Sequence, residues 1–221
     1  MAVVVPAAGR GERAGTDKVW ADAGGRPLIA LVLERIAALA NVDAVIVVCP
    51  AARHPAVQEV GRSVGLSGVR CVPGGPRRRD SVAAGLAAVG EADIVVVHDA
   101  ARPLVSTALI ESVIAAARVH GAATAAVPCV DTIKRVEDGL VVETLPRGAL
   151  VAVQTPQAFS APLLRRAHAI APELDASDDC LLVERLGEPV AVVPGEIGNR
   201  KITHPEDLVW LRGELRGSAG S

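Results

Sequence analysis

Near its start the sequence reads Ala2-Val3-Val4-Val5-Pro6-Ala7-Ala8-Gly9-Arg10-Gly11, a β-branched run that leads directly into a glycine-containing turn. Continuous apolar runs without polar alternation are typical of strands covered on both faces. Segments with helical spacing separate this run from similar ones at Ala44–Cys49, Val69–Val72, Ile94–Val97 and Ala122–Val127. This β-α-β-α order predicts an α/β fold with a doubly wound, mostly parallel, Rossmann-like sheet.

The alternation is interrupted near residue 130. Asp131–Thr144 contains two short strand-like runs around Glu137-Asp138-Gly139, and Asp-Gly is a strong hairpin signal. We therefore expect one domain over 1–216, with an antiparallel β-arm at about 130–147 and a loose tail over 217–221. The α/β pattern then resumes, with a strand at Leu150–Val153, helices from Ala161, Asp178 and His204, and a strand at Val190–Val193.

Composition excludes several classes of protein. Half of the residues are hydrophobic and the formal net charge is −2, which argues against disorder. No apolar run reaches the length of a membrane span and no signal peptide is evident, so we expect a cytoplasmic protein. The near-neutral charge and the scarcity of aromatic residues argue against nucleic-acid binding. Four widely spaced cysteines favour free thiols over a zinc site or disulfides.

The first turn is a candidate phosphate-binding loop, because small residues let backbone N–H groups approach phosphate oxygens closely. An ordinary glycine turn is the simplest alternative. Gly9-x-Gly11-x-x-Ala14 also fits a dinucleotide fingerprint loosely, but the second strand ends without the acidic residue that holds a ribose. A P-loop is disfavoured because the pattern GxxxxGK[ST] is absent. The cations of the loop suit a triphosphate and are Arg10, Arg13 and Lys18.

Two further segments follow predicted strands, where open α/β sheets bind ligands. In His98-Asp99-Ala100-Ala101-Arg102-Pro103, Asp99 is a candidate Mg²⁺ ligand, and an ion pair with Arg102 is the alternative. His98 is expected to be a hydrogen-bonded turn residue, and the other four histidines surface or capping residues. In Gly74–Ser81, Asp80 or Ser81 is a candidate helix cap. Arginines 77 to 79 form either a solvated face or a phosphate contact.

Six segments occur in one order along the chain: Pro6-Ala7-Ala8-Gly9-x-Gly11-x-Arg13 with Lys18, Gly74-Gly75 with Asp80-Ser81, His98-Asp99-Ala100-Ala101-Arg102-Pro103, Asp131-Thr132-Ile133-Lys134, Gln154-Thr155-Pro156-Gln157 and Lys201-Ile202-Thr203. With this set the whole chain resembles the 2-C-methyl-D-erythritol 4-phosphate cytidylyltransferase family of the non-mevalonate isoprenoid pathway. The resemblance implies a nucleotidyltransferase fold and Mg²⁺-dependent transfer of CMP from CTP to 2-C-methyl-D-erythritol 4-phosphate, with release of pyrophosphate and formation of 4-diphosphocytidyl-2-C-methyl-D-erythritol.

The resemblance also implies roles for single residues. The catalytic group is Arg13, Lys18, Arg147 and Lys201. The nucleotide-binding group is Ala7, Ala8, Gly9, Gly11, Gly75, Asp80 and Ser81. The substrate-binding group is Asp99, Arg102, Thr132, Thr155 and Ser177, and Asp99 also serves the metal. The arm would clasp a second subunit in a homodimer, so that Thr132 and Arg147 act in the partner's site.

Alternative functions remain open at this point. A cytidylyltransferase for ribitol 5-phosphate or another polyol phosphate is the nearest, and a sugar-nucleotide transferase using GTP or UTP is more distant. A nucleotide-binding module without catalysis would not require Arg13, Lys18 and Lys201 together. No Ser or Cys beside a His suggests a protein nucleophile, which favours direct transfer that relies on positioning and charge neutralisation.

Overall fold

The structure is a computed structural model that describes residues 1–9, 18–170, 173 and 175–218. The strands are β1 (Ala2–Pro6), β2 (Ala44–Val48), β3 (Arg70–Val72), β4 (Ile94–Val97), β5 (Ala122–Pro128), β6 (Lys134–Glu137), β7 (Leu140–Thr144), β8 (Val151–Ser160) and β9 (Ala191–Pro194). The α-helices are α1 (Leu28–Ala37), α2 (His54–Ser63), α3 (Arg78–Ala88), α4 (Thr107–His120), α5 (Ala161–Ile170), α6 (Asp179–Glu184) and α7 (Pro205–Ser218). Short 3-10 turns are η1 (Lys18–Trp20), η2 (Ala51–Arg53) and η3 (Arg147–Ala149).

The central sheet has seven strands in the order β3-β2-β1-β4-β8-β5-β9. Strand β1 pairs in parallel with β2 and β4, and the pairs β2–β3 and β5–β9 are also parallel. Strand β8 is antiparallel to both of its neighbours, β4 and β5. The predicted mostly parallel sheet is thus confirmed, although β8 is much longer than the strand expected at Leu150–Val153.

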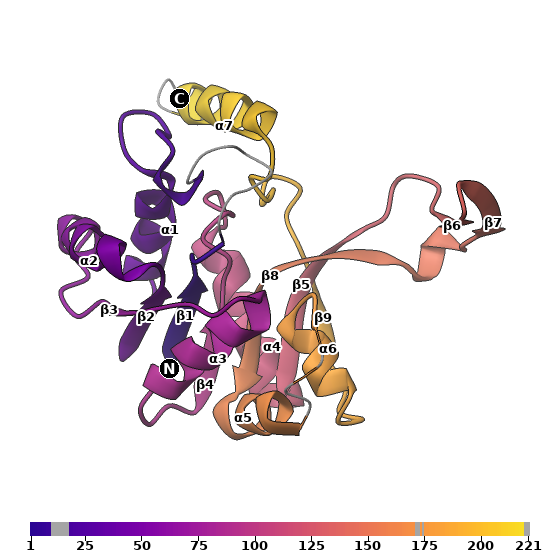
Figure 1. Ribbon diagram of the computed structural model, residues 1–221, viewed down its shortest axis with the longest axis horizontal. Coiled ribbons are helices and arrows are strands. Elements are labelled where there is room, and N and C mark those ends of the chain that lie inside the picture. Colours follow the sequence, from indigo (N-terminus) through magenta and orange to yellow (C-terminus); the bar gives the residue numbers. More distant parts are fainter. Residues whose placement is uncertain (10–17, 171–172, 174, 219–221) are drawn as a thin grey trace.

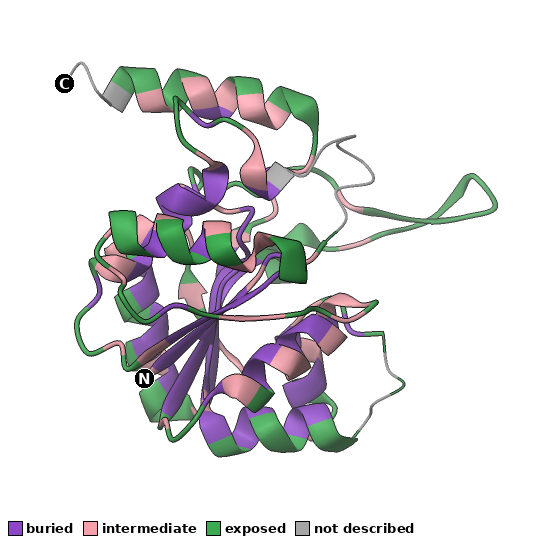
Figure 2. Cartoon of the chain, turned by 60° about the vertical axis from the view of Figure 1, so that its left-hand side comes forward, coloured by how far each residue is buried: buried purple, intermediate pink, exposed green. Residues whose placement is uncertain are grey.

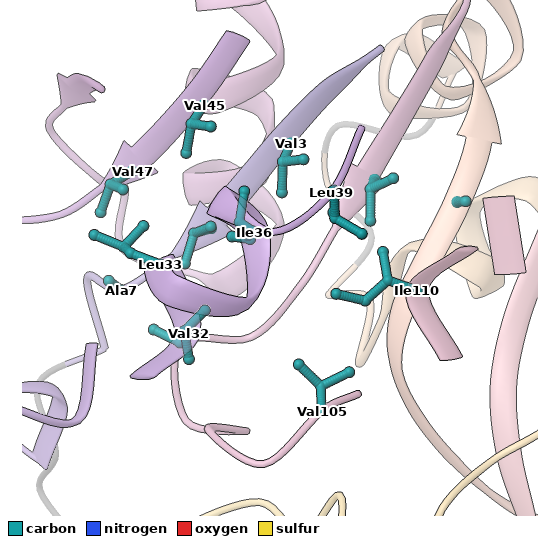
Figure 3. Close-up of a cluster of buried hydrophobic side chains, with 14 of the residues drawn as sticks. Val3, Ala7, Val32, Leu33, Ile36, Leu39, Val45, Val47, Val105 and Ile110 are labelled. Carbon is teal, nitrogen blue, oxygen red and sulfur yellow. The ribbon is translucent and has the colours of Figure 1, made fainter. Parts of the chain in front are cut away.

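Helices cover both faces of this sheet because successive side chains of a strand point to opposite faces. Val3 and Val5 of β1 belong to a core cluster with apolar residues of α1 and α4 (Figure 3). Ala2 and Val4 belong to a second cluster, together with residues of α3, α5 and α6. The strands near the centre of the sheet are accordingly buried in Figure 2, which is why they appear as unbroken apolar runs in the sequence.

The starts of three helices can be compared with the sequence. The Ser106 hydroxyl accepts from the backbone N–H of Leu109 at the start of α4, as predicted. The helix expected from Asp178 is α6, and Asp178 is its N-cap residue. Helix α3 begins at Arg78, so Ser81 does not cap it and Arg77 is the N-cap residue. Asp80 contributes to the cap from the third position of the helix, because its carboxylate accepts from the backbone N–H of Arg77 in a capping box.

Strands β6 and β7 form a separate two-stranded arm that projects from the rest of the molecule (Figure 1). The predicted hairpin is confirmed, with Asp138 and Gly139 at φ values of 50° and 79° in its turn. At the other end, α7 continues to Ser218, so the expected tail begins as helix, and residues 219–221 lie outside the described part. Of the helices formed by the described residues, none combines the length and apolar character that a membrane span requires.

Candidate active site

Two predicted nucleotide-binding segments meet beyond the carboxyl ends of β1 and β3. A Cβ atom added to Gly74 would lie 2.3 Å from the Cβ of Ala8 and 2.9 Å from the Ser81 hydroxyl oxygen, so only glycine permits this approach. The backbone N–H of Gly75 donates to the same Ser81 oxygen over 3.2 Å. Ala8, the Gly74-Gly75 turn and the start of α3 therefore form one continuous surface.

Asp80 lies beside this surface but is already paired within its own turn. The Arg77 guanidinium donates through Nη2 to Oδ1 over 2.7 Å and through Nε to Oδ2 over 2.8 Å. The hydrogen bonds from Arg77 lower the pKa of the Asp80 carboxyl. The geometry thus gives Asp80 a local role in shaping the turn that carries Gly75.

Asp99 is the centre of the candidate site. It follows β4, and its side chain is only 10% exposed. Lys201 Nζ donates to its Oδ2 over 2.7 Å, and Nε and Nη2 of Arg78 each lie 3.4 Å from its Oδ1. Burial alone would raise the pKa of Asp99, but the charges of Arg78 and Lys201 outweigh burial and hold it well below its usual range. Asp99 is therefore an anion shared by two cations.

Backbone contacts bring Lys201 to Asp99 from the far end of the chain. The N–H of Ile202 donates to the carbonyl of Ala101 over 2.8 Å, which fixes the Lys201 segment against the loop after β4. The neighbouring Arg200 takes a structural role, with its guanidinium 4.5 Å from the ring centre of Trp210. Lys201 is thus held in place while its side chain remains 43% exposed.

The alternative pairing of Asp99 with Arg102 is wrong. Arg102 Nη1 donates to the carbonyl of Asn199 over 2.8 Å, and the two described cations that pair with the Asp99 carboxylate are Arg78 and Lys201. Arg102 contacts Asp99 only through the turn, where its N–H donates to the Asp99 carbonyl over 3.0 Å. Arg102 thereby links the β4 loop to the loop after β9.

Thr155 and His98 support Asp99 from behind. The Asp99 N–H donates to the Thr155 hydroxyl over 3.0 Å, and that hydroxyl lies 3.2 Å from Nδ1 of His98. Nε2 of His98 lies 3.0 Å from the carbonyl of Arg102. Burial lowers the pKa of His98 to about 4, so the ring is neutral near pH 7. A neutral ring with its proton on Nε2 donates to Arg102 and accepts from Thr155. His98 is therefore a hydrogen-bonded turn residue, as predicted.

The segment around Thr155 lies where the ladder between β5 and β8 is interrupted. The register shifts between Thr124 and Ala126 of β5, opposite residues 154–156 of β8. Side chains replace the missing partners: the Thr124 hydroxyl donates to the carbonyl of Gln154 over 3.2 Å. The Asn199 amide donates to the carbonyl of Thr155 over 2.8 Å. The break frees Thr155 from regular pairing and lets it face Asp99.

Sequence reasoning missed the buried charges behind Asp99. Arg78 Nη1 donates to Oδ2 of Asp179 over 2.8 Å, and Nε2 of His168 lies 3.0 Å from Oδ1 of the same residue. Arg79 is also buried, and donates to the His168 carbonyl. The expected surface position of His168 is therefore wrong, and Arg78 and Arg79 do not form a solvated face. The Asp178-Asp179 pair was the sequence signal that could have pointed to this cluster.

The remaining predicted site residues are not joined to this cluster. Thr132 and Arg147 lie at the base of the arm, where Arg147 donates to the carbonyl of Val130 over 2.6 Å. Ser177 is exposed just before α6. Gly11 and Arg13 lie outside the described residues, and Lys18 is placed by its backbone, as the first residue of η1.

The described residues contain no group of three or more His, Cys, Asp or Glu side chains that could hold a metal ion by themselves. Mg²⁺ in nucleotide sites usually binds one or two carboxylates together with substrate phosphates, so it does not need such a group. Asp99 is ionised, and its neighbour Ala100 donates to the carbonyl of Pro6 over 3.4 Å at the start of the candidate phosphate-binding turn, so Asp99 fits that pattern. The four cysteines, all within the described part of the chain, form no disulfide.

Known proteins resemble the chain over nearly its whole length. A model of the family described as 2-C-methyl-D-erythritol 4-phosphate cytidylyltransferase matches residues 1–215. The protein of that name from Pelotomaculum thermopropionicum is 43% identical over 228 residues, covering 100% of this chain and 96% of the relative. The "Bifunctional enzyme IspD/IspF" of Anaeromyxobacter dehalogenans is 44% identical, but the chain spans only 56% of that longer protein.

A solved structure shows the same fold. The crystal structure of 2-C-methyl-D-erythritol 4-phosphate cytidylyltransferase from Thermus thermophilus matches with a TM-score of 0.81 and 40% identity. The match covers 97% of this chain and 98% of that chain. The predicted fold class is therefore confirmed by a solved structure as well as by the topology of the sheet.

Proposed function

The chain belongs to the 2-C-methyl-D-erythritol 4-phosphate cytidylyltransferase family, whose reaction is the transfer of CMP from CTP to 2-C-methyl-D-erythritol 4-phosphate, and we propose that the cluster around Asp99 carries it out. The products are pyrophosphate and 4-diphosphocytidyl-2-C-methyl-D-erythritol. The observation that supports this location is the meeting of Asp99, Lys201 and the turn containing Gly74 at the carboxyl ends of the parallel strands.

CTP lies along the first turn in this proposal. Backbone N–H groups of the turn hold its phosphates. They can do so because Ala8 and Gly74, which approach closely, carry little or no side chain, so that backbone lies at the surface. Gly75 and Ser81, joined by a hydrogen bond, present main-chain and hydroxyl groups to cytosine. Ala7, Gly9 and Gly11 complete the nucleotide contacts, and Asp80 fixes the turn through Arg77.

The transfer itself needs no protein nucleophile. An oxygen of the substrate phosphate attacks the α-phosphorus of CTP in line, and the bond from that phosphorus to the bridging oxygen of pyrophosphate breaks. The attacking phosphate is already an anion, so no base has to remove a proton. The protein positions the two substrates and offsets the charge that spreads over the phosphoryl oxygens. Arg13 and Lys18 stabilise this charge from the first turn.

The second substrate binds on the other side of Asp99. Its phosphate forms an ion pair with the Lys201 ammonium, which is partly exposed, and its hydroxyl groups donate to the Asp99 carboxylate. Thr155, Ser177 and Arg102 complete this side of the site. Mg²⁺ would be held by Asp99 together with phosphate oxygens, and when bound it supplies further neutralisation of the triphosphate charge.

The arm supplies the remaining substrate contacts to a second copy of the chain. Its apolar side chains are exposed, with Leu140 at 71% and Val141 at 61%. An exposed apolar ribbon of this kind is typical of an interaction surface. A homodimer formed through the arm would bring Thr132 and Arg147 to the partner's site. Cytoplasmic location also fits, because none of the four cysteines, all of them described, forms a disulfide.

The test is pyrophosphate release from CTP with a panel of polyol phosphates. We expect release with 2-C-methyl-D-erythritol 4-phosphate and much slower release with ribitol 5-phosphate, and ATP, GTP and UTP serve as nucleotide controls. Release with ribitol 5-phosphate alone would overturn the substrate assignment. Release with none of the panel would leave a nucleotide-binding module in place of an enzyme.

A further inference from the structure

Asp179 is a buried carboxylate that the transfer reaction does not use directly. Its side chain is 1% exposed, so it cannot contact either substrate. Its two oxygens are divided between two partners: Oδ2 accepts from Nη1 of Arg78 over 2.8 Å, and Oδ1 lies 3.0 Å from Nε2 of His168. Burial alone would raise the pKa of Asp179, but the hydrogen bond from His168 and the charge of Arg78 outweigh burial and lower it. The carboxylate is thus ionised inside the protein.

Arg78 connects this carboxylate to Asp99. One end of its guanidinium, Nη1, is held by Asp179, while Nε and Nη2 each lie 3.4 Å from Oδ1 of Asp99. The guanidinium is planar and rigid, so fixing one nitrogen fixes the direction of the other two. Because Arg78 occupies Oδ1, Oδ2 is the Asp99 oxygen that faces Lys201.

Strand β8 and helix α5 hold Asp179 in place directly, and helix α3 does so through α5. Its backbone N–H donates to Oε1 of Gln157 in β8 over 3.2 Å. His168, at the end of α5, is anchored in turn, because its carbonyl accepts from Nη2 of Arg79 over 3.0 Å. Asp179 therefore cannot follow Arg78 if that side chain moves, which is the property that a fixed support requires.

We propose that Asp179 is a positioning residue for cytidylyl transfer, which acts through Arg78 to hold the Asp99 carboxylate with Oδ2 turned toward the polyol phosphate. This inference rests on the proposed function, because it takes Asp99 as the residue that meets the second substrate. Arg78 has a positioning role as well, because it links the buried Asp179 carboxylate to Asp99 in the site.

The variant that isolates this role is Asp179→Asn. The amide keeps the size of the side chain and an oxygen for His168, but it removes the charge that holds Nη1 of Arg78. We expect kcat/KM for the polyol phosphate to fall about 10- to 100-fold, the loss typical of a misplaced reacting group, while KM for CTP stays within about twofold. The control is Glu196→Gln, which alters a partly buried carboxylate bonded to Ser106, outside this network.

A double-mutant cycle with Asp99→Asn separates positioning from fold stability. If Asp179 acts through Asp99, adding Asp179→Asn to Asp99→Asn lowers kcat/KM by less than about twofold further. Fully additive losses, or unchanged kinetics of Asp179→Asn, would overturn the proposal. An active Asp99→Asn enzyme would instead refute the location of the proposed function.

Thermal unfolding shows whether each variant is folded. Should Asp179→Asn not fold, Arg78→Lys replaces it in the same cycle, because lysine keeps the charge but cannot bridge two carboxylates. The same loss for the polyol phosphate and the same non-additivity with Asp99→Asn are expected. Wild-type kinetics of Arg78→Lys, or additive losses, would count against the proposal.

Discussion

The Asp99 cluster and the arm place their side chains in opposite ways. In the cluster, charged groups are inside: Asp99, Asp179 and Arg79 are buried, and each has partners from another part of the chain. In the arm, apolar groups are outside, with Leu140, Val141 and Val142 exposed (Figure 2). The cluster draws its partners from within one chain, whereas the arm presents the kind of surface that a second chain would cover.

The difference shows where each region obtains its order. Buried charges are stable only when they are paired, so the contacts of Asp99 fix their own geometry before any substrate arrives. The ion pairs of the arm, from Arg135 to Glu137 and Glu143, are exposed and contribute little to stability. The arm therefore owes its shape to its turn and strand pairing, and in the proposed dimer a partner would bury it. Four experiments test this contrast.

The largest effect is expected for the lysine of the Asp99 cluster, compared with a lysine of the arm. Lys201→Ala removes the cation that, in the proposed reaction, binds the attacking phosphate of the second substrate, and we expect kcat/KM to fall about 100- to 1,000-fold, or roughly 3–4 kcal/mol of barrier. Lys134→Ala removes a lysine of the arm that donates to Thr144, and we expect a change within about twofold. Initial rates of pyrophosphate release measure both. Equal losses would show that the arm also carries a catalytic cation.

The second test concerns the apolar surface of the arm. Leu140 and Val142 are both exposed apolar residues of β7, at 71% and 46%. Replacing both with lysine should weaken dimerisation at least about 100-fold, because each buried aliphatic side chain contributes about 1.5–3 kcal/mol. Sedimentation velocity over a range of concentrations measures the change, and Lys134→Ala is the charge control. An unchanged sedimentation coefficient would show that the arm does not join two chains.

The third test uses the buried histidine of the cluster. Burial lowers the pKa of His98 from 6.5 to about 4, so the unfolded chain binds a proton that the folded chain does not. The free energy of unfolding should therefore fall by about 2 kcal/mol between about pH 7 and about pH 5. Urea unfolding at a series of pH values measures the slope. His98→Gln should flatten it, and a wild-type slope in that variant would assign the effect to other groups.

The smallest effect is expected at the turn of the arm. Gly139 has a φ of 79°, so Gly139→Ala is strained by about 1–2 kcal/mol although its side chain would meet nothing nearby. We expect a loss of about tenfold in dimer affinity and no change in the kinetics of the saturated dimer. Glu137→Ala, on the neighbouring strand, keeps an ordinary backbone, removes only an exposed ion pair and serves as the control. Impaired turnover in the saturated dimer would contradict the purely local role of this turn.

Local patterns predict those parts of the fold whose physical cause is itself local. The β-branched runs indicated the buried strands, Ser106 indicated a helix start, and Asp138-Gly139 indicated the hairpin. Strand β8 was underestimated because Pro156 argues against a strand interior, and the structure places this proline at the break in the ladder. Of the two caps proposed for α3, Ser81 was wrong because Arg77 occupies the position before the helix, whereas Asp80 does accept from the first backbone N–H in a capping box.

Contacts between distant parts of the chain could not be predicted in the same way. Asp99 and Lys201 lay in segments with chemical motifs, so both were proposed, but their pairing spans 102 residues. Arg78 and Asp179 are 101 residues apart, and no local periodicity relates them. His168 was assigned to the surface because helical spacing does not show that α5 turns this residue toward a buried carboxylate.

The interruption in β8 has a consequence for how the molecule can be modified. Residues 157–160 pair with β4, and residues 151–153 pair with β5 near the arm, while residues 154–156 between them are held by the side chains of Thr124 and Asn199. The two halves of the strand therefore keep their registers independently. We therefore expect that arms of different length or sequence can be exchanged between relatives at residues 130 and 151 without shifting Thr155 relative to Asp99, which in the proposed dimer would make the arm a module for engineered pairings of unlike subunits.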